Sequence, residues 1–101
     1  MGLGLNVHRQ GDICTGHGCF PPRVSTEGSP DVNVNGIPAH RLGDAWDSHC
    51  CPDKGCHTSK LALGSTSVKV NGLSLGRAGD LIECGSFASS SQCSPDVFSG
   101  G

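Results

Sequence analysis

Histidine and cysteine supply most of the potential chemistry of this chain, with 5 histidines and 7 cysteines among 101 residues. Imidazole and thiolate both bind zinc, and thiols also pair as disulfides. Three of these donors follow an arginine at nearly equal spacing: His17 and His49 lie eight residues after Arg9 and Arg41, and Cys84 lies seven residues after Arg77. This spacing predicts that three equivalent segments of a repeated structure each contribute one metal ligand.

A closed tetrahedral zinc site needs a fourth donor. The interval from Arg41 to Arg77 is 36 residues, against 32 from Arg9 to Arg41, and the longer interval contains the segment Cys50–His57. We predict that His57 is the fourth ligand. Three imidazoles and one thiolate would hold one structural Zn²⁺, with no open position for an activated water. Metal binding would stabilise the folding of a small chain directly.

The remaining donors allow several interpretations. His8 and His40 each precede the arginine of their unit, but Gly76 takes that place in the third unit, so we interpret both histidines as structural. Six cysteines could pair as disulfides, fill small spaces in the core or form a second metal site through two C-x4-C spacings: Cys14, Cys19, Cys50, Cys51, Cys56 and Cys93. Neither spacing is the C-x2-C of a zinc ribbon, so a second metal is not predicted.

Conventional catalytic motifs are missing from the sequence. Cys56 and His57 are neighbours, and neighbouring side chains on a strand point to opposite faces, so they cannot act as nucleophile and base. The sequence has no P-loop, no G-x-G-x-x-G after a strand and no G-x-S-x-G elbow. We therefore expect no enzyme and predict no catalytic or cofactor-binding residues. A small zinc or thiol enzyme is the less favoured alternative.

An internal repeat must position the ligands. Residues 28–44 align with residues 64–80 at an offset of 36, and the shared pattern is G-S-x-x-V-x-V-N-G, four residues, then R-x-G-D. Self-similarity at a fixed period indicates repeated structural units. A third copy is split between the ends, because Arg9–Asp12 supplies its R-x-G-D and Ser94–Gly101 matches Ser29–Gly36. The two termini should therefore lie side by side, and three units should close a ring around a pseudo-threefold axis.

Each unit has the pattern of a β-hairpin. Apolar and polar residues alternate in 32–35 and 68–71, which is typical of a strand with one buried face. Asn35-Gly36 and Asn71-Gly72 then supply the residues that a tight hairpin turn needs. The arginine and aspartate of R-x-G-D could pair around the glycine bend. We expect the Ser-rich stretch near Ser86 to Ser91 to be exposed.

Composition restricts the class of protein. The 16 glycines and 6 prolines make up about a fifth of the chain, well above the roughly 12 in a hundred of average usage, so long helices are unfavoured. We predict an all-β fold in a single domain, residues 1–101. The net charge of −2 leaves no basic stripe for phosphates, so nucleic acid is not an expected partner. The sequence shows no membrane span and no signal peptide, which predicts synthesis in the cytoplasm.

Several segments resemble the PAAR-repeat proteins. Pro38-Ala39-His40-Arg41 is similar to the Pro-Ala-Ala-Arg motif of that family, with histidine in third place, and Ser74-Leu75-Gly76-Arg77 departs further. The wider pattern is more specific: G-D-I-C-T-G-H-G-C-F-P-P-R at 11–23, G-S-P-D-V-N-V-N-G at 28–36 and R-A-G-D-L-I-E-C-G at 77–85 are all similar to family segments. The resemblance spans nearly the whole chain.

The resemblance implies a fold and a partner. The fold is a small cone of β-hairpins with three pseudo-threefold repeat units, the third completed by the two termini, and with zinc near its vertex. The blunt base sits, one tip per trimer, on a trimeric β-helical spike: a VgrG-type trimer of a type VI secretion system, or the tail spike of a bacteriophage baseplate. The family's zinc ligands, three histidines and one cysteine, carry over onto His17, His49, His57 and Cys84.

The resemblance also implies how such a protein is used. It caps and sharpens a membrane-piercing spike, leaves the cell at the spike tip and contacts the target-cell envelope transiently. Some members carry effector domains, and this chain resembles the stand-alone form, with effector cargo as an optional partner. A free-standing zinc-binding interaction module is the alternative from another class, since it would share the ligands without needing a base that matches a trimer.

Overall fold

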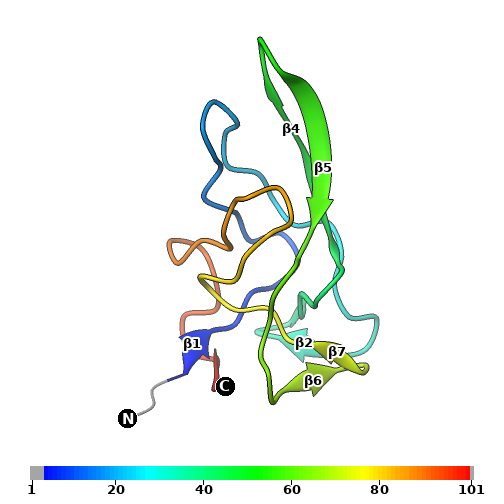
Figure 1. Cartoon of the computed structure of the whole chain (residues 1–101). Coiled ribbons are helices and arrows are strands. Elements are labelled where there is room, and N and C mark those ends of the chain that lie inside the picture. Colours follow the sequence, from blue (N-terminus) through cyan, green and yellow to red (C-terminus); the bar gives the residue numbers. More distant parts are fainter. Residues whose placement is uncertain (1–3, 101) are drawn as a thin grey trace.

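The computed structural model of the chain describes residues 4–100, and its Cα atoms extend over 42 × 30 × 21 Å. The molecule tapers from a broad base, which holds the chain ends and several short strands, to one long hairpin at the opposite end (Figure 1). Residues 4–100 contain no helix, as the glycine and proline content predicts. Accordingly, no helix there is long and apolar enough to cross a membrane.

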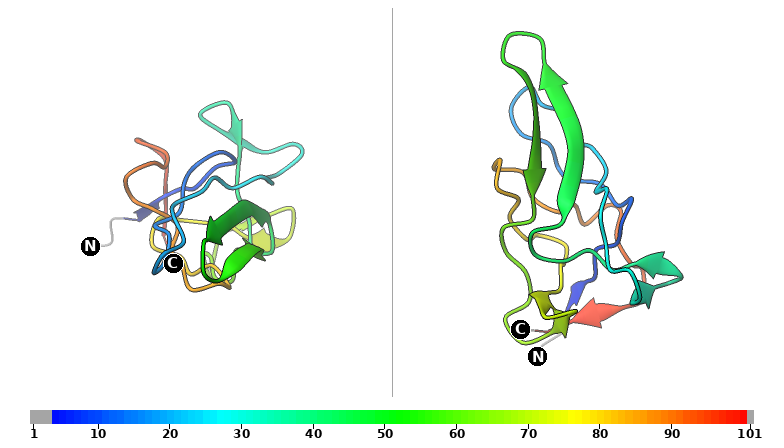
Figure 2. Two further views of the ribbon diagram at one scale, coloured as in Figure 1. Left: turned by 90° about the horizontal axis from the view of Figure 1, so that it is seen from above. Right: turned by 90° about the vertical axis from the view of Figure 1, so that its right-hand side faces the viewer.

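In the described part of the chain, residues 4–100, eight strands form four separate two-stranded antiparallel sheets. The pairs are β1 (Leu5–Asn6) with β8 (Phe98–Ser99), β2 (Asn33–Val34) with β3 (Ile37–Pro38), β4 (Ala45–Cys51) with β5 (Gly55–Lys60), and β6 (Lys69–Val70) with β7 (Leu73–Ser74). The pairing of β1 with β8 brings the N-terminal and C-terminal segments together, as the split repeat predicts, and the right-hand view of Figure 2 places both strands at the base. The all-β prediction is confirmed for the described residues.

The two short hairpins turn at Asn-Gly pairs, as predicted. Asn35 and Gly36 have φ of 55° and 76°, and Asn71 and Gly72 have φ of 54° and 78°. Two consecutive residues at positive φ make a turn whose twist matches that of the flanking strands, and asparagine and glycine adopt this conformation most readily. The same dipeptide therefore produces the same hairpin at two places in the molecule.

The three R-x-G-D segments form the same ion pair three times. In each, the guanidinium donates through Nε and Nη2 to both carboxylate oxygens of the aspartate three residues later, at 2.9–3.1 Å, and the arginine N–H donates to the same carboxylate. All three aspartates are buried: Asp12, Asp44 and Asp80. Bidentate pairing of this kind fixes the geometry of the bend and also balances the charge of the buried carboxylate.

A cycle of backbone contacts joins the three units. His40 N–H donates to the carbonyl of His8, His8 N–H to that of Gly76, and Gly76 N–H to that of His40, at 2.8–3.0 Å. Bridges between neighbouring units follow the same cycle: Val7 with Arg77, Leu75 with Arg41, and Ala39 with Arg9. Each unit thus contacts the next, and the third contacts the first.

A second cycle lies among the hairpin turns and the loops that precede the strands. The Asn71 Oδ1 accepts from Ser29 Oγ at 2.6 Å, and the Asn35 Oδ1 accepts from Ser94 Oγ at 2.6 Å. The third member uses the Gly100 carbonyl, which accepts from Ser65 Oγ at 3.0 Å. Gly100 occupies the repeat position of the two asparagines, so a backbone carbonyl replaces a side-chain amide there.

Two small apolar clusters fill the interior. The upper cluster consists of Cys14, Trp46, Leu61, Ile82 and Ala88, and the lower one of Val7, Ala39, Val70 and Leu75. Cys14, Trp46 and Ile82 each lie five residues after the arginine of their unit and are at most 1% exposed. The same repeat position is therefore a cysteine in one unit, a tryptophan in another and an isoleucine in the third. The three side chains need not be alike, because together they fill one shared interior.

Two expectations about burial hold only in part. Val34 and Val70 pack on the lower cluster, as the alternation predicts, but Val32 and Val68 are 38% and 37% exposed. Val32 and Val68 lie just before β2 and β6, which have only two residues each and are too short to bury a whole face. The Ser-rich stretch is also not simply exposed, because Ser86, Ala88 and Ser89 are buried and bonded to neighbouring segments.

Candidate metal centre

The long hairpin brings two predicted ligands together. His49 on β4 and His57 on β5 are direct cross-strand partners, so their side chains leave the same face of the hairpin. Their Nε2 atoms lie 2.6 Å apart. The register beyond them pairs Cys50 with Cys56, which form a disulfide across the two strands. The hairpin thus holds two imidazoles at a fixed separation.

His17 reaches the same point from a tight loop. His17 and Phe20 exchange backbone hydrogen bonds of 3.0 and 2.8 Å, and Gly16 at φ 72° starts the turn, where a Cβ would meet the Phe20 carbonyl at 2.6 Å. A disulfide from Cys19 to Cys51 anchors this loop to β4. Each of these cysteines lies two residues after a histidine of the group, so the disulfide joins equivalent positions of two repeat units.

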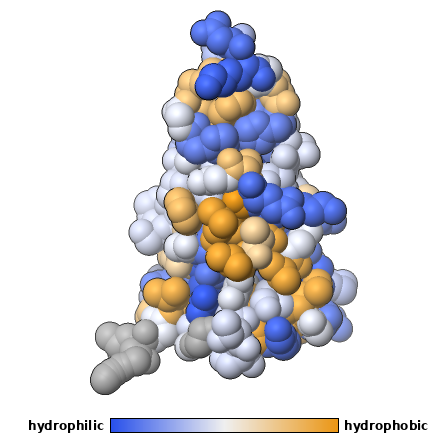
Figure 3. All heavy atoms as spheres, viewed as in Figure 1, coloured by the Kyte–Doolittle hydropathy of each residue, from blue (hydrophilic) through white to orange (hydrophobic). Residues whose placement is uncertain are grey.

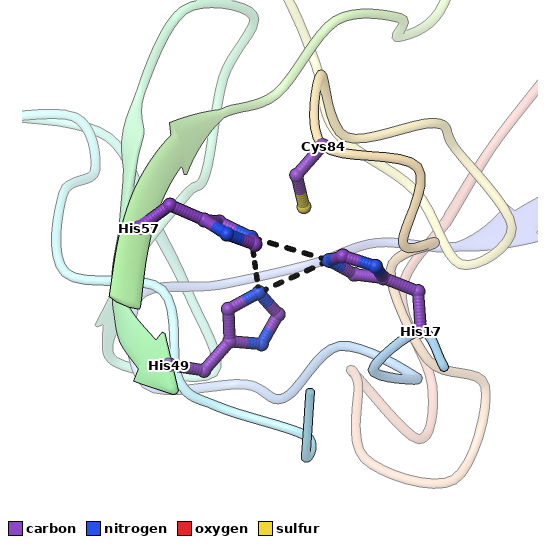
Figure 4. A group of neighbouring side chains, drawn as sticks. All are labelled: His17, His49, His57 and Cys84. Atoms are coloured by element: carbon purple, nitrogen blue, oxygen red, sulfur yellow. Dashed lines mark hydrogen bonds between the residues drawn. The ribbon is translucent and has the colours of Figure 1, made fainter. Parts of the chain in front are cut away.

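Cys84 comes from a third segment. Its N–H donates to Ser59 Oγ at 3.0 Å, which attaches the segment to β5, and Gly85 follows at φ 103°. The side chain points toward the three imidazoles (Figure 4). Cys84, the predicted sulfur ligand, therefore lies beside the three imidazoles, on a loop rather than on a strand.

The four ligand atoms converge on one point. The Nε2 atom of His17 lies 3.2 Å from those of both His49 and His57, and all four ligand atoms lie within 4.8 Å of one another. Zinc with bonds of about 2.0–2.1 Å to nitrogen would set tetrahedral N···N separations of about 3.3 Å. The two distances from His17 match this value, whereas His49 and His57, at 2.6 Å, would have to separate slightly. With that adjustment the group could hold a metal ion of this size.

The hydrogen bond made by the outer ring nitrogen of His49 also favours metal binding. The Nδ1 atom of His49 lies 2.8 Å from the Pro21 carbonyl, which can only accept, so Nδ1 carries the proton and Nε2 presents a lone pair. A carbonyl partner on the outer nitrogen is the usual way in which a protein fixes a metal-binding imidazole. The Phe20 ring packs on the rings of His17, His49 and His57, with ring centres 4.4–5.0 Å apart, and this packing limits the rotation of the three imidazoles.

Comparison with known families decides the affiliation. Residues 15–88 match the PAAR motif family. This chain is a PAAR protein. The family comprises spike-tip proteins of type VI secretion systems, which bind the VgrG spike, leave the cell at its tip and are generally structural rather than catalytic. No curated protein matches the sequence.

Cys84 in this PAAR protein is placed in a strongly polar surrounding. Burial by itself would raise the pKa of its thiol. Hydrogen bonds from the Ser86 backbone and hydroxyl, from His57 and from Arg23 outweigh burial and lower the pKa to about 5. Because metal ligands bind as thiolates, this surrounding favours the ligand form of the side chain.

The two histidines interpreted as structural lie in the interior of the PAAR protein, away from the ligand group. His8 Nε2 lies 2.8 Å from the Ser89 carbonyl and His40 Nδ1 lies 2.8 Å from the Glu27 carbonyl. Burial lowers the pKa of both, that of His40 to about 4. Their rings pack against Trp46.

The sequence left open whether the cysteines form disulfides, fill the core or bind a second metal, and the structure shows the first two. Four of them form the disulfides Cys19–Cys51 and Cys50–Cys56, while Cys14, Cys84 and Cys93 are free thiols. Cys14 fills a core position. Neither C-x4-C spacing forms a pair of its own, because Cys19 bonds to Cys51 and Cys56 bonds to Cys50. The repeat offset of 32 residues between His17 and His49 also separates Cys19 from Cys51, a signal in the sequence that could have identified this disulfide.

The ligand group lies below the extreme end of the PAAR protein. Beyond the His49–His57 pair, β4 and β5 continue through the Cys50–Cys56 pair to a turn at 52–54. At about 3.3 Å per residue, the turn extends roughly 10 Å past the two histidines. The outermost element is thus a hairpin closed by a disulfide (Figure 1).

Proposed function

We propose that this PAAR protein caps a trimeric β-helical spike and carries one structural Zn²⁺ bound by His17, His49, His57 and Cys84. The observation that carries the proposal is the convergence of four donors from three repeat units in a chain of this family. Four protein ligands would leave the metal without an open position, so its role is to hold segments together rather than to activate water.

The base is the proposed docking surface. It gathers the β1–β8, β2–β3 and β6–β7 pairs, one from each unit, and their contacts repeat in a cycle (Figure 2). Exposed apolar side chains lie on these strands and the segments before them: Leu5, Val32, Val68, Leu73 and Phe98. A single chain with pseudo-threefold symmetry could offer an equivalent surface to each subunit of a trimer. We therefore propose a single tip domain with one copy per trimer.

The metal centre is tested by elemental analysis of the purified protein. We expect one zinc per chain. His49→Ala and Cys84→Ser should lose the metal and lower the thermal unfolding temperature, because binding to the folded state alone stabilises it. Cys93→Ser, at a free cysteine outside the ligand group, is the matched control and should keep the metal. A folded, metal-free protein with unchanged thermal stability would refute the proposal.

The docking surface is tested by native mass spectrometry with a VgrG-type trimer and, separately, with a trimeric phage tail spike. We expect one tip per trimer. Phe98→Asp places a charge on an apolar base residue that is 55% exposed and should abolish the complex. Phe87→Asp, on a residue 46% exposed that contacts Thr15 and Leu81 rather than the base strands, should leave it intact. Three tips per trimer would contradict the idea.

A free-standing zinc-binding module is the competing function. It would bind zinc equally well but would bind neither spike, and Phe98→Asp would then change nothing. The proposed role instead predicts that the protein leaves the cell only together with a functional spike. Detection of the protein outside cells that lack the spike subunit would count against it.

A further inference from the structure

Arg23 is a buried cation beside the ligand group. The residue is 6% exposed and uses all three nitrogens of its guanidinium. Nε donates to the Asp47 carbonyl at 2.7 Å, Nη1 to Cys14 Sγ at 3.0 Å and Nη2 to Cys84 Sγ at 3.5 Å. The guanidinium carbon also lies 5.6 Å from the centre of the Trp46 ring.

These three acceptors belong to three different repeat units. Cys14 follows the first R-x-G-D, Asp47 the second and Cys84 the third. One planar group therefore joins the three segments that lead to His17, His49 and the sulfur ligand. It adds a side-chain link to the backbone bridges that already join these segments, Cys14 with Ala88 and Ser25 with Trp46.

The charge of Arg23 has no ordinary partner. Arginine remains protonated in proteins, and a buried cation is costly unless an anion accompanies it. The ion pairs found in residues 4–100 are those of the three R-x-G-D segments, and none involves Arg23. Among its acceptors a carbonyl cannot ionise, whereas a sulfur that binds a metal does so as a thiolate.

We propose that Arg23 is a positioning residue for the metal centre: it donates to the Cys84 sulfur from outside the ligand group, holds it toward the three imidazoles and compensates the thiolate charge. The inference rests on the proposed metal centre. Cys14 serves as the fixed end of this arrangement, because its buried sulfur also accepts the N–H groups of Gly16 and Arg23 at 3.4 Å. Arg23 thus cannot move without breaking contacts in two other units.

Lysine could not replace Arg23 in this role. A guanidinium presents donors in three fixed directions within one plane, whereas an ammonium is a compact charge on a flexible stem. Lysine would retain the positive charge but could not hold a carbonyl and two sulfurs at once. The comparison of Arg23→Lys with Arg23→Met therefore separates the contribution of charge from that of geometry.

The test uses the full chain loaded with Co²⁺, because zinc is spectroscopically silent and a cobalt–thiolate centre shows a sulfur-to-metal charge-transfer band. An N–H donor stabilises the sulfur lone pair from which the electron leaves. Arg23→Met should therefore move the band to longer wavelength, and Arg23→Lys should move it less. Loss of a partner outside the ligand shell should also weaken zinc binding about 10–100-fold in chelator competition.

Arg9→Met is the matched control, since it makes the same change in an arginine of the base that contacts Asp12 and no ligand. It should lower stability without moving the band. If Arg23→Met and Arg23→Lys both leave the band and the zinc affinity as in the unaltered protein, Arg23 is only a structural cation and the inference is overturned. If the unaltered chain itself binds no cobalt or zinc, the metal centre is refuted, and this inference falls with it.

Discussion

The base and the narrow end of this protein are held together in different ways. At the base, three units make the same hydrogen bonds and ion pairs in turn, and a small apolar cluster lies between them. At the narrow end, residues 48–58 bury only His49 and Cys51. Two disulfides and the ligand group replace a core there, and the extreme tip is hydrophilic, with hydrophobic residues directly below it (Figure 3).

The difference shows how a taper can be stabilised. A wide region encloses enough side chains to exclude water, so repetition of weak contacts suffices. A region only one hairpin wide has no interior, and covalent or metal cross-links must take the place of packing. The width of each region therefore determines how it is stabilised: by repeated contacts around a core at the base, and by cross-links at the narrow end.

The largest effect should come from opening the cycle at the base. Deletion of residues 94–101 removes β8, Ser94 and the Gly100 carbonyl, and with them the contacts of the third unit to both neighbours. A domain of this size has a free energy of unfolding of only about 5–15 kcal/mol. We expect the truncated chain to lose cooperative thermal unfolding in circular dichroism. A melting temperature equal to that of the parent would show that the cycle is not what holds the base.

Metal removal should affect one region and spare the other. If zinc exceeds its dissociation constant 1,000-fold, chelation should cost about 4 kcal/mol. Hydrogen exchange of amides in the loop of His17 and in β4–β5 should accelerate, while the amides of His8, His40 and Gly76 stay protected. Uniform acceleration over the whole chain would instead mean that the two regions unfold as one.

The disulfides should contribute unequally. Cys19–Cys51 has a sequence separation of 32 and Cys50–Cys56 one of 6, and the entropy of the unfolded chain falls more when the longer loop is closed. We expect Cys19→Ala/Cys51→Ala to lower the free energy of unfolding by about 4 kcal/mol and Cys50→Ala/Cys56→Ala by about 2 kcal/mol, measured by urea denaturation. The reverse order would mean that the shorter loop does more to hold the ligand pair.

Acid should weaken the interior through His40. Burial lowers its pKa to about 4, below the 6.5 of the unfolded chain, so the unfolded state takes up the proton first. The stability from neutral His40 is therefore full above pH 6.5 and is lost as the pH falls toward 4, by about 2 kcal/mol between pH 7 and 5.

Urea denaturation of metal-free protein at both pH values measures this loss and avoids protonation-driven release of zinc. His40→Phe is the control and should show a smaller difference between the two pH values. An NMR titration that finds His40 protonating near pH 6.5 in the folded protein would exclude the effect.

The sequence predicts most of what repetition produces. Asn-Gly turns, the arginine–aspartate pairs and the joined termini follow from residue types at a fixed offset, because each depends on local conformation. The approach of His17, His49 and Cys84 to one another follows from the same spacing, and that of His57 from the longer interval between Arg41 and Arg77. Zinc itself stays a prediction.

Properties that depend on tertiary packing were beyond the sequence. Ser86 and Ser89 are polar yet buried, because short segments need hydroxyls and carbonyls to satisfy their backbone groups. Arg23 ends the family-like segment 11–23, but its role was not predicted, since it lies outside the repeated pattern and its contacts depend on three segments meeting. The repeat offset could have identified the Cys19–Cys51 disulfide, whereas Cys50–Cys56 depends on the register of β4 with β5.

The cycle of hydrogen bonds through His8, His40 and Gly76 has a mechanical consequence. A sheet with an open edge can be peeled, since its outermost strand detaches first and exposes the next one. A closed cycle offers no outermost member, so a pull on any one unit is shared by its two neighbours and failure requires several bonds to rupture together. Such a base would yield abruptly at high force rather than gradually at low force, a property that suits the spike-tip role proposed above.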